Sequence, residues 1–278
     1  MLLAVQQFIP EFGAVEANRR RLIAALEATP DAERIDLVVL PELIVTGYRF
    51  RDRAELERLA EPIPGPTTEA FGALARRLDL HLVIGLAERA GERVYNSAAL
   101  VGPTGVVGRY RKVHLFADER RIFDAGSEPW PVFRVGDVPV GIMICFDWIY
   151  PEAARTLALH GAWVIAVPAN LVLPLCQPAL VTRSIENRVF TALANRAGAD
   201  RRQGLEPLRF TGRSRIVGPD GEVLVEVGCE DEAVCTVEID PALAADKTLA
   251  SGNEIFAERR PDLYGALTEP PGAGGSGE

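Results

Sequence analysis

The sequence is poor in the residues from which disulfide scaffolds and metal sites are built. Its 278 residues include only three histidines and four cysteines, and no cysteine lies in a CxxC pair or at a zinc-type spacing from another. The length also excludes a disulfide-stapled miniprotein, because a chain of this size buries a full apolar core without cross-links. We therefore expect a cytoplasmic protein with reduced thiols and no bound metal.

Long basic runs and long apolar runs are absent as well. The chain has 30 basic and 39 acidic residues, a net charge of −9, and its longest basic run covers only residues 19–21. This balance predicts no binding to nucleic acid or to an anionic membrane. The longest apolar runs, such as residues 162–169, are far shorter than the ~20 residues needed to span a bilayer. The opening residues, MLLAVQQF, lack the basic region and cleavage site of a signal peptide, so we expect none.

What the chain does contain is an alternation of apolar strands and amphipathic helices. Short apolar runs predict strands at 2–8, 36–43, 81–89, 138–145 and 162–170, and helical periodicity predicts helices at 18–29, 67–78, 151–161 and 178–197. A hairpin over 97–115 and further strands after residue 210 add antiparallel pairing, so the pattern predicts a mixed α/β fold. No Gly/Ser-rich linker divides the chain. We expect one domain over residues 1–270 and a flexible tail over 271–278, PGAGGSGE.

Three reactive side chains lie at or beside the ends of apolar strands. Glu42 follows DLVVLP, and Cys145 follows VGIMI. Lys112, one of only two lysines among the 30 basic residues, lies in GRYRKVHLF. In α/β folds the side chains at strand ends converge on one crevice, so we expect these three to meet although they are far apart in the sequence.

Together these side chains support acyl transfer through a thioester. Cys145 would be the nucleophile, Glu42 would take its proton, and Lys112 would favour the thiolate and stabilise the oxyanion. The backbone N–H of Phe146 is the natural second oxyanion donor, because this residue directly follows the nucleophile. Glu42 would then protonate the departing ammonia and activate the water that hydrolyses the thioester.

The same segments resemble the nitrilase superfamily of carbon–nitrogen hydrolases, in particular its small microbial amidase and nitrilase branch. The resembling segments are LPELIVTGY around Glu42, YRKVHLF around Lys112 and GIMICFDWIYPEAARTLALHGA around Cys145, and similar stretches extend to NEIFAERRPDLY at 253–264. The resemblance implies a Glu-Lys-Cys triad on a four-layer αββα sandwich that uses no cofactor and forms a homodimer or a larger assembly. The composition of residues 253–264 also suits an interface.

The resemblance further implies a second glutamate, shortly after the lysine, that supports the lysine and the substrate amine. Glu119 matches this position best, and Glu128 is the weaker candidate. Candidates for the substrate pocket are Tyr48, Phe116, Phe146, Trp148, Asn170 and Leu171. A place in the ordinary core is an equally good interpretation for the aromatic side chains and the leucine.

Other reactive residues have simpler interpretations. We expect His114 to be a hydrogen-bonded scaffold residue and Asp147 to cap a helix or pair with an arginine. Cys176, Cys229 and Cys235 are interpreted as structural, although Cys176 could lie near the pocket. Ser214 lacks a GxSxG elbow and is rejected as a nucleophile.

These observations predict a hydrolase acting on a small amide or nitrile. The first hypothesis is an amidase that converts a small aliphatic amide to a carboxylic acid and ammonia. A nitrilase or an N-carbamoyl-amine or amino-acid hydrolase would use the same triad, and Arg155 or Arg183 could bind a substrate carboxylate. A metabolite-binding or interaction protein on the same scaffold is the non-enzymatic alternative.

Overall fold

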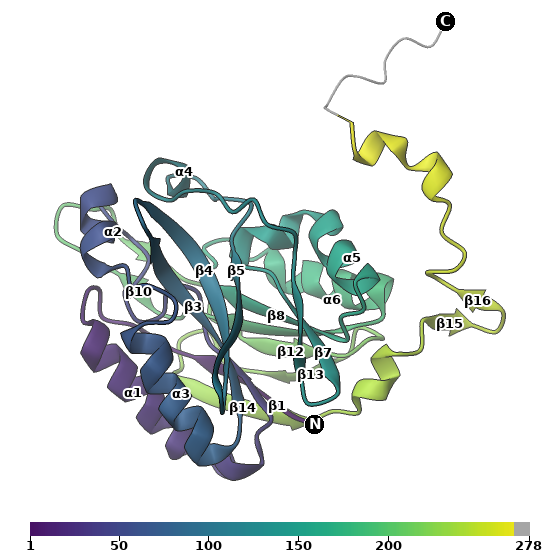
Figure 1. Cartoon of the computed structure of the whole chain (residues 1–278), viewed down its shortest axis with the longest axis horizontal. Coiled ribbons are helices and arrows are strands. Elements are labelled where there is room, and N and C mark those ends of the chain that lie inside the picture. Colours follow the sequence, from purple (N-terminus) through teal and green to yellow (C-terminus); the bar gives the residue numbers. More distant parts are fainter. Residues whose placement is uncertain (270–278) are drawn as a thin grey trace, which may run out of the picture. The chain divides into compact units, whose positions relative to one another are not determined.

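Two six-stranded sheets form the core of residues 1–245 in the computed structural model, which describes residues 1–269 of the chain (Figure 1). The first sheet has the strand order β14-β1-β2-β3-β4-β5, with β1 (Leu2–Gln7), β2 (Leu37–Val39), β3 (His81–Ala90), β4 (Arg93–Gly102), β5 (Gly105–Arg111) and β14 (Ala233–Glu238). The second has the order β13-β12-β9-β8-β7-β6, with β6 (Val132–Val135), β7 (Val138–Ile142), β8 (Val164–Ala169), β9 (Phe190–Asn195), β12 (Arg215–Val217) and β13 (Val223–Glu226). In both sheets the central pairs are parallel and the outer pairs antiparallel, so the predicted mixture of pairings is confirmed.

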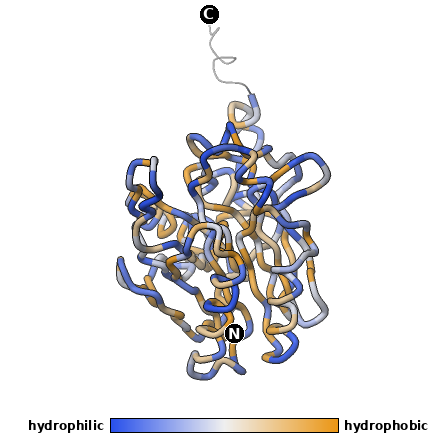
Figure 2. Tube along the Cα trace, turned by 90° about the vertical axis from the view of Figure 1, so that its left-hand side faces the viewer, coloured by the Kyte–Doolittle hydropathy of each residue, from blue (hydrophilic) through white to orange (hydrophobic). Residues whose placement is uncertain are grey.

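Helices cover the outer face of each sheet, and the two inner faces pack together. α1 (Val15–Glu27) and α3 (Pro66–Leu78) flank the first sheet, whereas α5 (Pro151–Leu159) and α6 (Cys176–Asn187) flank the second (Figure 1). Between the sheets β1 packs on β9 and β3 packs on β8. Hydrophobic residues gather along the strands between these layers (Figure 2). The arrangement is the predicted four-layer αββα sandwich.

Two short helices and a small hairpin lie beyond the sheets. α2 (Arg53–Leu59) and α4 (Glu119–Ile122) contact each other, and α2 also contacts β3. β10 (Ala199–Asp200) pairs with β11 (Leu208–Arg209) to form a separate two-stranded ribbon. These elements border the end of the sandwich at which the reactive side chains gather.

The helix predicted over residues 178–197 is wrong in its second half. α6 ends at Asn187, Arg188 adopts a left-handed backbone (φ 49°), and Phe190–Asn195 form β9 inside the second sheet. The strand opens with Phe190 and Thr191, whose aromatic and β-branched side chains suit a pleated, buried surface. Pairing with β8 on one side and β12 on the other overrides the helical tendency of the alanines and leucine that follow.

A second unit begins at Asp246 and its described part reaches residue 269, whereas a single domain is expected over residues 1–270. Its described part contains the short hairpin β15 (Thr248–Ala250) and β16 (Asn253–Glu254), followed by single turns of 3₁₀ helix. The tail expected over 271–278 lies outside the described residues. Within residues 1–269, every helix is too short or too polar to cross a bilayer.

Candidate active site

Glu42 lies shortly after β2, where the backbone turns sharply. Leu43 has a left-handed φ of 50°, and Glu42 is fully buried. β3 approaches so closely that a Cβ atom on Gly85 would lie 2.4 Å from the Cα atom of Glu42, so only glycine fits there. The apolar strand and the glycine opposite its end therefore bring a carboxylate into the protein interior.

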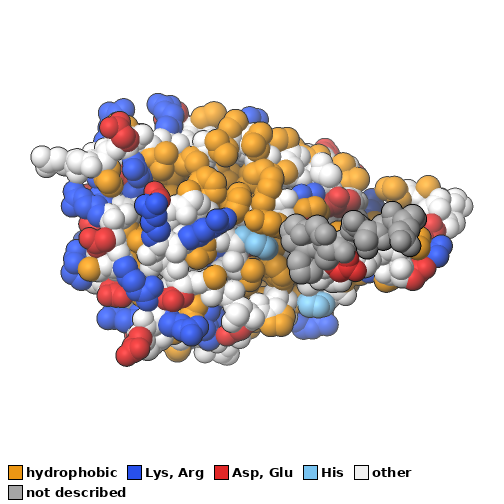
Figure 3. All heavy atoms as spheres, turned by 90° about the horizontal axis from the view of Figure 1, so that it is seen from above, with side chains coloured by type: hydrophobic (Ala, Val, Ile, Leu, Met, Phe, Trp, Pro, Cys, Tyr) orange, Lys and Arg blue, Asp and Glu red, His pale blue; other side chains and the backbone are white. Residues whose placement is uncertain are grey.

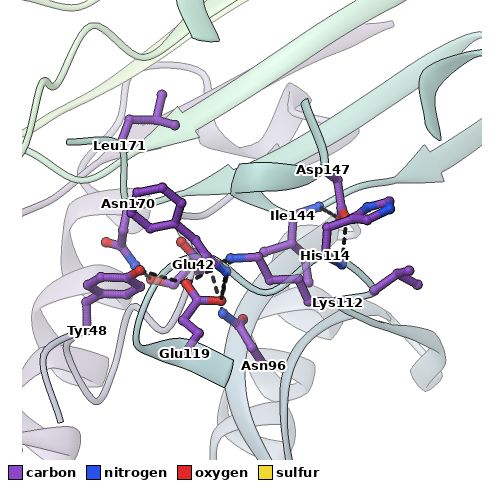
Figure 4. A network of polar contacts seen from close by, with 12 residues as sticks. Glu42, Tyr48, Asn96, Lys112, His114, Glu119, Ile144, Asp147, Asn170 and Leu171 are labelled. Atoms are coloured by element: carbon purple, nitrogen blue, oxygen red, sulfur yellow. Dashed lines mark hydrogen bonds and ion pairs between the residues drawn. The ribbon is translucent and has the colours of Figure 1, made fainter. Parts of the chain in front are cut away.

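The side chain of Glu42 is held through one of its two oxygens. Oε1 accepts hydrogen bonds from Nζ of Lys112 and from Nδ2 of Asn96, each at 2.7 Å (Figure 4). Oε2 is buried and has no hydrogen-bond partner among residues 1–269. From the second sheet, Nδ2 of Asn170 donates to the backbone carbonyl of Glu42 at 2.7 Å. The carboxylate is thus fixed in place while one oxygen remains available to accept a proton.

Lys112 directly follows β5 and is enclosed by two carboxylates. Its Nζ lies 2.7 Å from Oε1 of Glu42 and 2.9 Å from Oε2 of Glu119, and its side chain is fully buried. Burial by itself lowers the pKa of Lys112, but Glu119 and Glu42 outweigh it and hold that pKa well above its ordinary value. Lys112 is therefore a permanent ammonium.

Glu119 begins α4, and its two oxygens accept from Nζ of Lys112 at 3.0 and 2.9 Å (Figure 4). The hydroxyl of Tyr48 donates to its Oε1 at 2.7 Å. Burial raises the pKa of Glu119, Lys112 lowers it and Glu42 raises it, with a net rise. The alternative, Glu128, is 53% exposed and forms ion pairs with arginines of β5 instead of Lys112.

Cys145 begins the 3₁₀ turn η2 (Cys145–Ile149), shortly after β7. Its left-handed φ of 44° marks a sharp turn between strand and helix, a geometry that presents nucleophiles in other hydrolases. Burial and Glu42 raise the pKa of the Cys145 thiol, whereas Lys112 and a hydrogen bond from the backbone N–H of Asn170 oppose the rise; the net pKa is well above the ordinary value. The thiol therefore needs a base in order to react at neutral pH.

A small apolar cavity of about 30 Å³ opens onto Cys145. It is lined by Phe116, Cys145, Phe146, Trp148, Asn170, Leu171, Val172 and Leu173. A wider cavity of about 530 Å³ shares Phe116 and Val172 with it and reaches Tyr48 and Glu119. Hence the structure brings the candidate pocket residues to the walls of two adjoining spaces, one at the nucleophile and one at the supporting glutamate.

The hydrogen-bond partners of two buried polar residues, Asn96 and Asp147, are not predicted from the sequence. Asn96 on β4 bonds to Glu42, and its only sequence signal is an amide just before the apolar second half of the strand. Asp147 caps its own turn through Ile144 and bonds to His114, where an arginine or the next helix is expected. His114 is hydrogen-bonded to the scaffold, as predicted.

The remaining candidates lie away from the cavity at Cys145. Cys176 is buried on α6 and is not among the residues that line either cavity in the described chain. Arg155 donates to the backbone carbonyl of Glu186, and Arg183 pairs with the side chain of the same glutamate. Residues 1–269 contain no cluster of three or more His, Cys, Asp or Glu side chains placed to hold a metal ion.

Comparisons with known proteins agree with this fold. A family model described as carbon-nitrogen hydrolase matches residues 2–247. A nitrilase from Pyrococcus abyssi is 46% identical over 229 residues, which are 82% of this chain and 86% of that protein. An (R)-stereoselective amidase from Pseudomonas sp. is 38% identical over 274 residues, 98% of this chain and 96% of the amidase. The crystal structure of a carbon-nitrogen hydrolase from Helicobacter pylori G27 covers 97% of this chain and 98% of its own, with a TM-score of 0.87 at 25% identity.

Proposed function

Because the chain belongs to the carbon–nitrogen hydrolase family, we propose that it is an amidase that converts a small aliphatic amide to a carboxylic acid and ammonia. The observation that carries the proposal is Oε2 of Glu42, which is buried without a partner in the described chain, together with the charge of Glu42, which raises the pKa of the Cys145 thiol. A base with an unoccupied acceptor and a nucleophile that needs deprotonation are complementary.

In the first half of the reaction, Oε2 of Glu42 accepts the thiol proton as Sγ of Cys145 attacks the amide carbon. The oxyanion that forms is stabilised by the positive charge of Lys112 and by the backbone N–H of Phe146. Protonated Glu42 gives its proton to the departing amine, which leaves as ammonia. The acyl group remains on Cys145 as a thioester.

In the second half, Glu42 acts again as a base. It takes a proton from water as the water oxygen attacks the thioester carbonyl, and the same two donors stabilise the second oxyanion. Collapse of this intermediate breaks the C–S bond, releases the carboxylic acid and returns the proton to the thiolate of Cys145. Amide and water are thereby converted to acid and ammonia.

The size and lining of the inner cavity support a small aliphatic acyl group. About 30 Å³ bounded by phenylalanine, tryptophan, leucine and valine side chains admits a short chain and offers little to a charged one. Longer substrates would have to extend into the wider cavity beyond Phe116 and Val172.

A nitrilase is the second candidate, and the 46% identical relative from Pyrococcus abyssi, itself named a nitrilase, favours it. Attack of Cys145 on a nitrile carbon would give a thioimidate, which two waters would convert to acid and ammonia. The same three side chains serve both reactions, so substrate preference separates them. For N-carbamoyl amino acids, Arg155 and Arg183 give no support, since both are engaged at Glu186.

We also propose that the chain forms a homodimer. Large apolar side chains are exposed on the adjoining elements η2, α5, α6 and the loop after β8, and an apolar area borders many arginines on the face shown in Figure 3. These side chains are Ile149, Leu159, Leu173, Leu175 and Ile185. Light scattering after size exclusion should give twice the chain mass of 30.2 kDa, and Leu173→Glu with Leu175→Glu should give the monomer mass. A monomeric wild-type protein would refute the dimer.

The test of activity is an ammonia-release screen over short aliphatic amides, the matching nitriles, N-carbamoyl compounds and glutamine analogues. Small amides should give the highest kcat/KM. Cys145→Ala should abolish turnover while the circular dichroism spectrum stays unchanged. Turnover that survives in purified Cys145→Ala would rule out the thioester mechanism.

A further inference from the structure

A single buried carboxylate, that of Asp147, collects four hydrogen bonds beside the nucleophile. Its Oδ2 accepts from the backbone N–H of Ile144 and from the hydroxyl of Tyr110, each at 2.8 Å. Its Oδ1 accepts from the backbone N–H of His114 at 3.3 Å and lies 2.8 Å from the Nδ1 atom of the same residue (Figure 4). Asp147 is fully buried, so these donors replace all the water that would otherwise solvate its charge.

The partners of Asp147 come from the two segments that carry the proposed nucleophile and ammonium. Ile144 immediately precedes Cys145 on the second sheet's side. Tyr110 and His114 stand two residues before and two residues after Lys112 on the first sheet's side. Asp147 itself belongs to η2, the turn that Cys145 begins. The side chain of Asp147 therefore joins the turn that contains Cys145 to the segment that contains Lys112, with partners on both sides of the lysine.

Ring contacts strengthen the same connection. The imidazole of His114 stacks on Tyr150, at the end of the Cys145 turn, with ring centroids 3.7 Å apart, and faces Trp130 at 5.7 Å. The hydroxyl of Tyr110 also accepts from the backbone N–H of Val113, so the chain around Lys112 folds back on itself. The ring contact of His114 with Tyr150 and its hydrogen bonds to Asp147 therefore both hold the Lys112 segment against the Cys145 turn.

We propose that Asp147 and His114 are positioning residues that fix the position of Sγ of Cys145 relative to Nζ of Lys112. The left-handed backbone of Cys145 is unfavourable for a residue other than glycine and persists only where its surroundings determine it. The bond from Ile144 to Asp147 fixes the residue before the thiol, and His114 ties that turn to the lysine segment. This inference rests on the proposed function, since Lys112 matters to Cys145 only if an oxyanion forms between them.

His114 is assigned to positioning and not to proton transfer because of where its donors point. Its Nδ1 and its backbone N–H both face Asp147, and its ring lies against Tyr150, whereas the unoccupied acceptor of the site belongs to Glu42. The two contributions of the imidazole can be separated by substitution. Phenylalanine keeps the stacked ring and removes the donor, while asparagine supplies a donor near the place of Nδ1 and removes the ring.

The experiment compares His114→Phe, His114→Asn and Asp147→Asn with Ser184→Ala as control. Ser184 shares a buried hydrogen bond with Thr191 at 3.0 Å on α6 and β9, so its loss tests stability without touching the site. For each protein, kcat and KM, the rate constant of Cys145 alkylation by iodoacetamide and the melting temperature are measured.

His114→Phe should lower kcat and the alkylation rate roughly tenfold with little change in KM, because a hydrogen bond to a buried charge is lost. Asp147→Asn should lower both roughly a hundredfold, because its amide turns an N–H toward groups that also donate. His114→Asn should recover most of the loss seen in His114→Phe. Ser184→Ala should lower only the melting temperature.

The proposal is overturned if His114→Phe changes the melting temperature but neither rate, or if His114→Asn is as slow as His114→Phe. If Asp147→Asn does not fold, the two His114 variants still decide the question. Alkylation needs no amide substrate. A wild-type protein that hydrolyses no C–N substrate, while His114→Phe still slows alkylation, would therefore refute the proposed function and leave the positioning role standing.

Discussion

Two neighbouring cations at the end of β5, Arg111 and Lys112, belong to two clusters whose carboxylates are hydrogen-bonded to different extents. Arg111 is the last residue of the strand and binds Glu88, with Nη2 2.6 Å from Oε1 and Nε 2.9 Å from Oε2. Ser97 adds a third hydrogen bond at 2.6 Å. Lys112, the next residue, points to the other side and meets Glu42 and Glu119. Both clusters are buried carboxylates paired with a cation from the same segment.

The two clusters differ in how completely their carboxylates are satisfied. Both oxygens of Glu88 are bonded, so the Arg111 cluster, formed by Ser97, Glu88 and Arg111, has no carboxylate oxygen without a partner. In the Lys112 cluster two carboxylates share one ammonium, and Oε2 of Glu42 has no partner in the described chain. Complete satisfaction stabilises a fold, whereas a buried carboxylate oxygen without a partner is what the proposed acid–base role of Glu42 requires.

The largest expected effect comes from removing the charge of Glu42. Glu42→Gln keeps the shape of the Lys112 cluster but removes its base, so kcat should fall by roughly a thousandfold or more. Alkylation of Cys145 should fall less than kcat, because Glu42 also protonates ammonia and activates water, steps that alkylation omits. Steady-state kinetics and iodoacetamide labelling of the same preparation measure the two. Near-normal hydrolysis in Glu42→Gln would show that the acid–base assignment is wrong.

Exchanging the two cations should have unequal effects. Lys112→Arg places a larger planar group between two carboxylates in a fully buried site, and kcat should fall roughly a hundredfold. Arg111→Lys loses the two-point contact with Glu88 and should lower the free energy of unfolding by about 1–2 kcal/mol with kcat within roughly threefold of wild type. Kinetics and urea unfolding of both variants give the comparison. Equal losses of kcat would contradict it.

Glu119 should control the acid limb of the activity profile. Because the pKa of Glu119 is raised above its ordinary value, this carboxyl gains its charge, and its full hold on Lys112, only above the usual titration range of a glutamate. The contribution of Glu119 to the free energy of unfolding changes with pH in the opposite direction from its charge. This contribution is full at low pH and is lost as the pH rises through the raised pKa. The rise of kcat/KM on the acid side of the profile should disappear in Glu119→Gln, which should remain roughly tenfold slower throughout. An unchanged acid limb would refute this role.

The sequence makes the Lys112 cluster predictable because its members stand in short motifs at strand ends. Glu42, Lys112 and Cys145 can each be located from an apolar run and the residues beside it, whereas Glu119 follows only from the resemblance to the carbon–nitrogen hydrolases. Asn96 cannot, because its contact depends on register: it lies opposite Ala87 in the antiparallel pairing of β4 with β3, and only that pairing carries its amide to Glu42. Such a partner is determined by tertiary structure.

The fold is also predictable only in part, because some element boundaries depend on long-range strand pairing. Alternating apolar runs and amphipathic helices are enough to predict a mixed α/β fold, and the resemblance to the carbon–nitrogen hydrolases adds the four-layer αββα sandwich. They are not enough to separate α6 from β9, where a helical stretch runs into a strand across two residues. The long-range pairing of β9 with two neighbours decides that boundary, and no local pattern contains it.

The smallest effect on catalysis is expected from Glu88→Gln, the counterpart of Glu42→Gln in the Arg111 cluster. Arg111 would be left without its buried anion, so the free energy of unfolding should fall by about 2–4 kcal/mol. The value of kcat should stay within roughly twofold, because both oxygens of Glu88 are bonded to Ser97 and Arg111 and not to the Lys112 cluster. Urea unfolding and steady-state kinetics measure the two quantities. A large loss of kcat at unchanged stability would mean that the Arg111 cluster takes part in the reaction and that satisfaction of hydrogen bonds does not separate the two clusters.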